Sequence, residues 1–90
     1  MKIEVCSAYV PDRIIYFYKI IDNNKAKSMY KISETEYNEI IQLLANKGYK
    51  NYIKCKVWIQ SHCLIFYNVD EETINEITSK YGELMSLLIW

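Results

Sequence analysis

The chain has 90 residues, of which 51% are hydrophobic, and its 11 basic and 11 acidic residues give a formal net charge of zero. This length fits one domain, residues 1–90, and the hydrophobic fraction excludes extended disorder, which requires low hydrophobicity and high net charge. The zero net charge excludes a general electrostatic attraction to nucleic acid or to a membrane, so any such attraction must come from a local cluster of charge.

The first third of the chain predicts three strands. Residues 2–10 are apolar and weakly alternating, and a turn at residues 11–12 contains the only proline. Residues 13–21 are apolar on both faces, so we expect a strand that is covered on both sides or uses its open face for binding. A second turn at residues 22–24 leads into a third strand at residues 26–32.

Two helices are predicted from their start and stop signals. Ser33 and Glu36 have the spacing of a capping box, and Gly48 is placed to end the first helix. Asp70 caps the second helix, and Gly82 ends it. Apolar residues recur at helical spacing in both segments, and these are Tyr37, Ile40, Ile41 and Leu44 in the first and Ile74, Ile77 and Tyr81 in the second.

A β-hairpin is predicted between the two helices. Residues 52–59 and 63–69 are rich in β-branched and aromatic side chains, and the polar residues 60–62 separate them. Residues 83–90 favour a last strand over a continued helix. The chain is therefore predicted to be a single small α+β domain with the order β-β-β-α-β-β-α-β and two helices on one face of an antiparallel sheet. Its last six elements match a ferredoxin-like core, which the two N-terminal strands extend or pack over.

The three cysteines predict packing, not a covalent framework or a metal site. Their number is odd and no two are closely spaced, which argues against disulfides and favours a reduced, cytoplasmic protein. Cys55 and Cys63 lie on adjacent arms of the hairpin, but a zinc site needs four ligands. We therefore expect no metal and no cofactor. No apolar run approaches the roughly 18 residues that span a bilayer, so no membrane partner is expected.

No arrangement of residues predicts catalysis. His62, the only histidine, stands at the hairpin tip between Ser61 and Cys63, where a nucleophile and its base are expected to be solvated. The two glycines, Gly48 and Gly82, are needed as helix stops, which excludes a glycine-rich phosphate loop. The chain is therefore predicted not to be an enzyme.

Lysines on the predicted strands indicate a binding face. Strand alternation places Lys54, Lys56 and Trp58 together, and they share an outer sheet face with residues of the second and third strands if the aliphatic positions pack on the helices. The predicted binding residues are Phe17, Lys19, Lys27, Lys31, Lys54, Lys56 and Trp58. The alternative is a solvated face on which lysine stems cover apolar surface. A register error of one residue would exchange the two faces.

These patterns predict a small non-enzymatic binding protein that self-associates, most simply as a two-fold dimer, and acts by binding or sequestering a protein partner. Ten lysines stand against a single arginine and Ile, Asn and Tyr are abundant, as in AT-rich coding; this suggests the further hypothesis of a viral or mobile-element inhibitor of a host component. The alternative function is the binding of an anionic ligand, a nucleotide or single-stranded nucleic acid, on a basic and aromatic sheet face.

Overall fold

The computed structural model describes residues 1–23, 25–58 and 61–87, without the side chains of residues 10, 26–27, 55–58 and 85–87. The elements follow the predicted order, and they are β1 (Lys2–Val10), β2 (Arg13–Asp22), β3 (Lys25–Ile32), α1 (Glu34–Asn46), β4 (Ile53–Trp58), β5 (Ser61–Phe66), α2 (Glu71–Lys80) and β6 (Glu83–Leu87). The strand predicted after the second helix is confirmed for residues 83–87, and its last three residues lie outside the described part of the chain.

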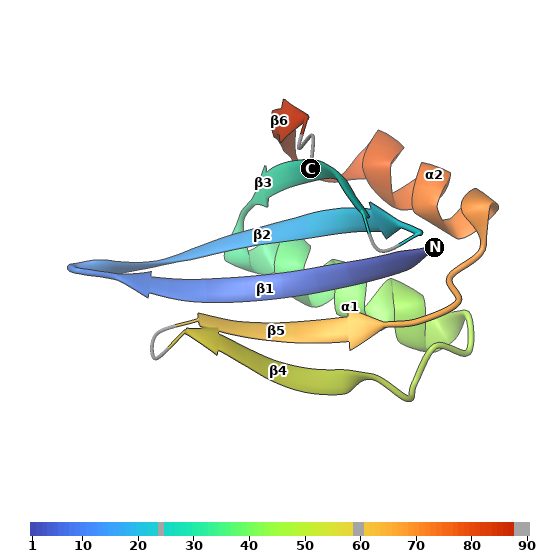
Figure 1. Ribbon diagram of the computed structural model, residues 1–90, viewed down its shortest axis with the longest axis horizontal. Coiled ribbons are helices and arrows are strands. Elements are labelled where there is room, and N and C mark those ends of the chain that lie inside the picture. The colour runs from blue at the N-terminus through green and yellow to red at the C-terminus, as the bar shows by residue number, and fades with distance from the viewer. Residues whose placement is uncertain (24, 59–60, 88–90) are drawn as a thin grey trace.

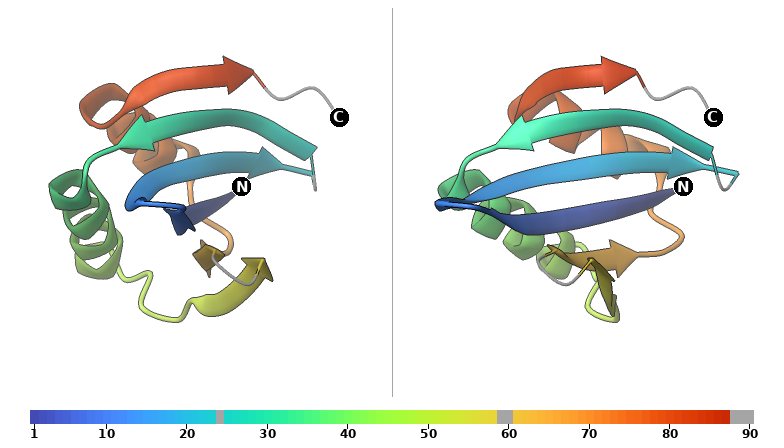
Figure 2. Two further views of the ribbon diagram at one scale, coloured as in Figure 1. Left: turned by 90° about the vertical axis from the view of Figure 1, so that its left-hand side faces the viewer. Right: turned by 60° about the vertical axis from the view of Figure 1, so that its left-hand side comes forward.

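The six strands form one antiparallel sheet in the order β4-β5-β1-β2-β3-β6 (Figure 1). Both helices pack on the same face of this sheet, and α1 passes behind the strands in Figure 1. Figure 2 shows the two helices together on one side of the sheet. Their buried side chains join those of the central strands in a single core. The predicted α+β class, with both helices on one face, is therefore confirmed.

The predicted ferredoxin-like strand order is not confirmed. In that order β3 and β5 would be neighbours, but here the β1–β2 hairpin lies between them and occupies the middle of the sheet. The expectation that the two N-terminal strands extend or cover the sheet is therefore wrong. The physical reason is burial, because the central position covers both edges of the hairpin and buries its most apolar side chains, Ile3, Val5, Tyr18 and Ile20.

Tyr18 joins the centre of the sheet to the end of α2. Its side chain is fully buried, its ring stacks on Tyr30 with 4.8 Å between the ring centroids, and its hydroxyl donates a 2.7 Å hydrogen bond to the Tyr81 carbonyl oxygen. Burial raises the pKa of the Tyr18 phenol far above its ordinary value. A tyrosine suits this position because the ring fills the core while the hydroxyl satisfies a backbone acceptor.

The predicted helix signals are confirmed. Ser33 Oγ accepts from Glu36 N at 3.1 Å and Glu36 Oε1 accepts from Ser33 N at 3.0 Å, which is a complete capping box. Gly48 and Gly82 both have positive φ, as the predicted helix stops require. The buried stripes lie where helical spacing puts them, with Ile40 and Leu44 buried in α1 and Ile74 and Ile77 in α2.

The connection between β4 and β5 is shorter than predicted. Ser61 and His62 belong to β5, where Ser61 stands opposite Trp58 and His62 opposite Lys56. The predicted turn at residues 60–62 is therefore wrong for its last two residues. The pairing of β5 with β1 continues to Ser61, so the backbone groups of these residues have partners in the neighbouring strand. Residues 59 and 60 lie outside the described part of the chain.

Candidate functional site

The sheet face that neither helix covers is the candidate site, and we call it the uncovered face. Strand register assigns residues to it, because partners in an antiparallel ladder present their side chains to the same face. One row across the strands runs Cys63, Cys6, Phe17, Lys31 and Glu83, and the backbone of Cys55 occupies the ladder position opposite Cys63. The next row runs Ile53, Ile65, Glu4, Lys19 and Met29.

Three of the predicted binding residues, Phe17, Lys19 and Lys31, come together on the uncovered face. Phe17 and Lys31 are direct partners across β2 and β3, and Lys19 lies two residues further along β2. Phe17 and Lys19 are partly exposed and Lys31 is exposed. Lys27 has the same strand parity as Lys31, but its side chain lies outside the described part of the chain. The binding role of all four stays a prediction.

Lys54 lies on the opposite face from these residues. It pairs with Leu64, which in turn pairs with Val5, and Val5 is fully buried in the core beneath the helices. The expectation that position 54 shares a face with Phe17 is therefore wrong. Lys54 remains exposed because β4 is an edge strand. Lys56 has the register parity of Lys54, and the side chains of Lys56 and Trp58 lie outside the described part of the chain.

The local reason for this error is the pattern of β4 itself. The aliphatic side of the strand, which includes Ile53, was expected to pack on the helices. Instead Ile53 pairs with Ile65 on the uncovered face and is 54% exposed. An edge strand does not have to bury its apolar side under the helical layer. The alternation of residues along β4 therefore predicts which side chains share a side of the strand, but not which side the helices cover.

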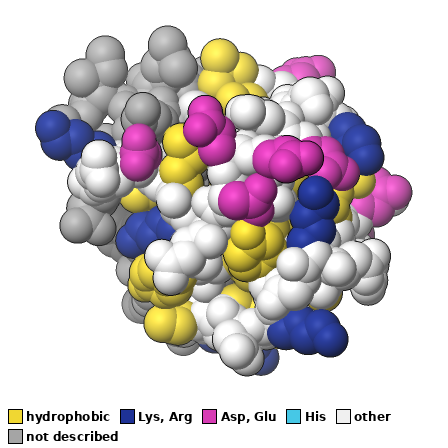
Figure 3. All heavy atoms as spheres, turned by 90° about the vertical axis from the view of Figure 1, so that its right-hand side faces the viewer, with side chains coloured by type: hydrophobic (Ala, Val, Ile, Leu, Met, Phe, Trp, Pro, Cys, Tyr) yellow, Lys and Arg dark blue, Asp and Glu magenta, His cyan; other side chains and the backbone are white. Residues whose placement is uncertain are grey.

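The lysines of the uncovered face stand beside acidic residues. Lys19 Nζ lies 3.9 Å from Glu4 Oε1, and Lys31 stands opposite Glu83 in the ladder. Lys19 therefore has a carboxylate next to it, and Glu83 occupies the ladder position opposite Lys31, so the face carries both signs of charge where the sequence predicted a basic face. Acidic side chains also gather on the side of the molecule that carries the start of α2 (Figure 3).

A disulfide links Cys6 on β1 to Cys63 on β5, with 4.1 Å between the two Cα atoms. The expectation of unlinked cysteines is therefore wrong. The number and spacing of the cysteines in the sequence do not indicate this pair. Its members are 57 residues apart, and only the order of the strands in the sheet brings them together. The disulfide also removes the observation that favoured a reducing compartment, so a cytoplasmic location stays a prediction.

One group of potential metal ligands occurs within the described residues. Oxygen of Glu4 and the sulfur atoms of Cys6 and Cys63 lie within 4.8 Å of one another. Both sulfur atoms are joined in the disulfide, whereas zinc is bound by thiolate sulfur and takes four ligands in structural sites. This group therefore does not make a metal site in the oxidised chain.

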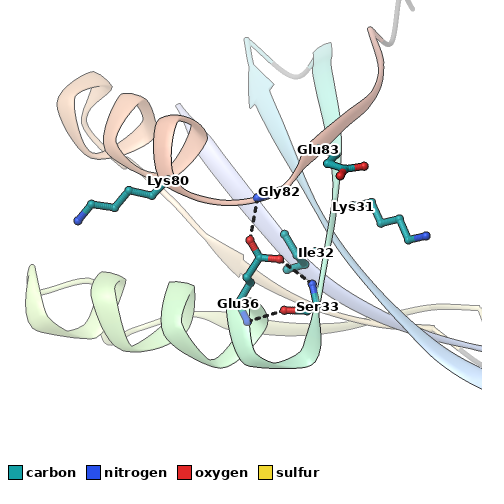
Figure 4. A pocket seen from close by; sticks show the side chains of 7 residues that line it. All are labelled: Lys31, Ile32, Ser33, Glu36, Lys80, Gly82 and Glu83. Carbon is teal, nitrogen blue, oxygen red and sulfur yellow. Dashed lines mark hydrogen bonds between the residues drawn. The ribbon is translucent and has the colours of Figure 1, made fainter.

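A hollow of about 450 Å³ lies where the start of α1 meets the turn between α2 and β6 (Figure 4). Its central polar group is Glu36, whose Oε2 accepts from Gly82 N at 3.0 Å while Oε1 accepts from Ser33 N. These backbone hydrogen bonds, that from Ser33 first, lower the pKa of the Glu36 carboxyl. Both oxygen atoms of this carboxylate therefore accept backbone hydrogen bonds, which join the start of α1 to the turn before β6.

The start of α2 carries a second hydrogen-bond network. Asp70 accepts from the Thr73 backbone and hydroxyl and from the Tyr49 hydroxyl, and its own N–H donates to Tyr49 Oη at 3.1 Å. The Thr73 hydroxyl, more than the other partners, lowers the pKa of the Asp70 carboxyl to about 2. These contacts tie the residues that follow α1 to the first turn of α2.

A comparison of the chain with protein-family models, curated proteins and solved structures finds no significant match. Neither helix in the described ranges is long and apolar enough to cross a membrane.

Proposed function

We propose that this chain is a non-enzymatic binding module that self-associates through its uncovered face. The observation that carries the proposal is the composition of that face, where an apolar strip of Ile15, Phe17 and Met29 on β2 and β3 lies beside the Lys19–Glu4 pair. In a two-fold dimer the same patch meets itself, so it must be complementary to its own copy. Apolar side chains beside Glu–Lys pairs satisfy this condition, whereas a purely basic face would repel its copy.

The apolar strip supports an interface because a two-layer domain normally covers only one face of its sheet. Ile15, Phe17 and Met29 are partly exposed on strands β2 and β3, and Ile53 is 54% exposed at the edge. Contiguous exposed apolar surface on a small domain usually marks a contact with another protein. The partner most compatible with the mixed charges is a second copy of the chain, and sequestering of another protein, as a viral or mobile-element inhibitor would do, is a further use of the same face.

The alternative is that the face binds a nucleotide or single-stranded nucleic acid. Phe17 is available for stacking, and Lys19 and Lys31 are available for phosphate contacts. Two observations disfavour this function: Glu4 and Glu83 stand beside these lysines, and Lys54 lies on the other face. Phosphate binding would have to compete with both carboxylates.

The test uses two edge residues of equal exposure on opposite faces. Ile53 and Leu84 are each 54% exposed, but Leu84 pairs with Tyr30, a core-facing residue, and so belongs to the helix side. Ile53→Lys is expected to raise the dimer dissociation constant at least about tenfold, since it places an unpaired charge in the apolar part of the proposed interface. Leu84→Lys is expected to leave it unchanged. Sedimentation over a range of concentrations measures both variants beside the wild type.

Circular dichroism and thermal unfolding establish that both variants fold. A wild-type chain that stays monomeric at high micromolar concentration, or equal effects of the two substitutions, would contradict the proposal. The alternative is measured in parallel as fluorescence anisotropy of labelled oligo(dT) and oligo(U) at about 50 and 200 mM salt, where phosphate contacts produce a steep loss of affinity. Binding that Lys19→Glu abolishes would favour the alternative.

A further inference from the structure

The three cysteines of the chain occupy consecutive ladder positions across three adjacent strands. Cys6 on β1 stands opposite Cys63 on β5, and Cys63 stands opposite Cys55 on β4. Cys63 is therefore a direct neighbour of both other cysteines, whereas Cys6 and Cys55 are separated by the whole of β5. The sequence contains no fourth cysteine, so one thiol remains when the Cys6–Cys63 disulfide is closed.

Backbone geometry permits a disulfide on either side of Cys63. The 4.1 Å between the Cα atoms of Cys6 and Cys63 is the close approach of a pair without mutual backbone hydrogen bonds. The N–H and C=O of one residue point to the same side of its strand, so Cys63 directs both toward β4. Cys55 and Cys63 are then a hydrogen-bonded pair with a Cα separation of about 5.5 Å, which lies inside the range that disulfides span.

We propose that Cys63 is a thiol–disulfide exchange site that pairs alternately with Cys6 and Cys55. The Cys55 thiol loses its proton to solvent, and the thiolate attacks Cys63 Sγ. The Cys55–Cys63 bond forms as the Cys6–Cys63 bond breaks, and Cys6 leaves as a thiolate that takes up a proton. The reaction consumes no oxidant or reductant. Attack at sulfur proceeds from the side opposite the leaving sulfur, and Cys55 and Cys6 belong to the strands on opposite sides of Cys63.

Exchange moves the covalent link within the sheet. In one form it joins the central strands β1 and β5, and in the other it joins β5 to the edge strand β4. Exposed edge strands are the part of a sheet that separates or pairs with another chain most readily. The Cys55–Cys63 form therefore holds β4 on the sheet, and the Cys6–Cys63 form leaves it held by hydrogen bonds and side-chain packing. This inference does not depend on the proposed dimer.

Trypsin places the three cysteines in separate peptides, residues 3–13, 55–56 and 57–80. The oxidised native chain is held at pH 8 without added thiol, acidified, blocked with N-ethylmaleimide and digested, and the linked peptides are identified by mass. We expect peptide 57–80 to be linked to 3–13 in one population and to 55–56 in another. We expect no link between 3–13 and 55–56. The same procedure in urea, where every pairing can form, shows that this link is detectable.

Two variants sharpen the result. After oxidation with oxidised glutathione, folded Cys6→Ser is expected to form the Cys55–Cys63 disulfide, while folded Cys63→Ser forms no internal disulfide because its cysteines are two strands apart. Non-reducing electrophoresis of dilute samples separates any link between chains. A native wild type that yields only the Cys6–Cys63 link, a native Cys6–Cys55 link, or free thiols in folded, oxidised Cys6→Ser would each overturn the proposal.

Discussion

Gly82 combines a left-handed backbone, a crowded position and a hydrogen bond to a side chain of α1. It ends the turn after α2 with φ of 84°, and its N–H donates to the Glu36 carboxylate. A Cβ at this position would lie 3.0 Å from Ile32 Cγ2 and 3.0 Å from the Lys31 carbonyl oxygen. Backbone conformation and crowding therefore both require glycine here. At Gly48, with φ of 98°, a Cβ would meet no neighbouring atom within 4 Å, so only the backbone conformation favours glycine.

The two glycines give a matched test of this difference. Gly82→Ala is expected to lower the free energy of unfolding by about 2–4 kcal/mol, since it combines a left-handed backbone with a contact that the β3 backbone cannot relieve. Gly48→Ala is expected to cost only about 1 kcal/mol, from the backbone alone. Chemical denaturation of the two variants measures the difference. An equal loss of unfolding free energy in the two variants would show that the residues around Gly82 move to accommodate the added Cβ without lowering stability.

At the scale of elements, α1 begins at the point where strand β3 leaves the sheet. Ile32 is buried at the end of the strand. The helix cap begins at the next residue, where the side chains of Ser33 and Glu36 each accept a hydrogen bond from the other's backbone N–H. Glu36 then reaches on to Gly82, so one side chain joins the start of α1 to the start of β6. The capping box is thus also a link between the two βα units of the fold.

Removal of the cap tests this double role. Ser33→Ala is expected to lower the free energy of unfolding by about 1 kcal/mol, because one helix N–H loses its acceptor. Glu36→Ala is expected to cost more than Ser33→Ala, because it also removes the acceptor of Gly82 N. Urea denaturation monitored by circular dichroism measures both losses. A Ser33→Ala variant as stable as the wild type would mean that the helix starts without this cap.

At the scale of the whole molecule, carboxylates connect the helical layer. Glu76 Oε1 lies 2.7 Å from Lys47 Nζ at the end of α1, and its Oε2 lies 3.2 Å from Lys80 Nζ one turn along α2. Lys47 is the main cause that lowers the pKa of the Glu76 carboxyl. Together with Glu36 and Asp70, Glu76 makes the native state favour the ionised form of three carboxyl groups.

Stability should therefore fall in acid. A carboxyl group whose pKa is lower in the folded chain contributes stability above its unfolded pKa, and that contribution is lost as the pH falls through the folded value. For Asp70 the window runs from about 3.8 down to about 2. Asp70→Asn is expected to flatten the pH dependence of the unfolding midpoint between pH 4 and 2. A midpoint that does not change with pH in this range would contradict the network at α2.

Local patterns in the sequence determined where the strands and helices lie. A capping box, a helix-ending glycine and an apolar stripe act over a few residues, so Ser33, Gly48 and the stripe around Ile40 could be interpreted without knowing the rest of the chain. The alternation of side chains along β2 likewise separated Phe17 and Lys19, which are partly exposed, from Tyr18, which is fully buried.

Only the tertiary structure decided the neighbours of each strand. The β1–β2 hairpin could have joined the sheet at an edge, and its central place results from burial on two sides that no local pattern reports. The face of Lys54 and the pairing of Cys6 with Cys63 both follow from that placement. A contact between residues 57 apart depends on the free energy of the whole packed chain. Closing so long a loop costs conformational entropy, and only the burial of the core offsets this cost.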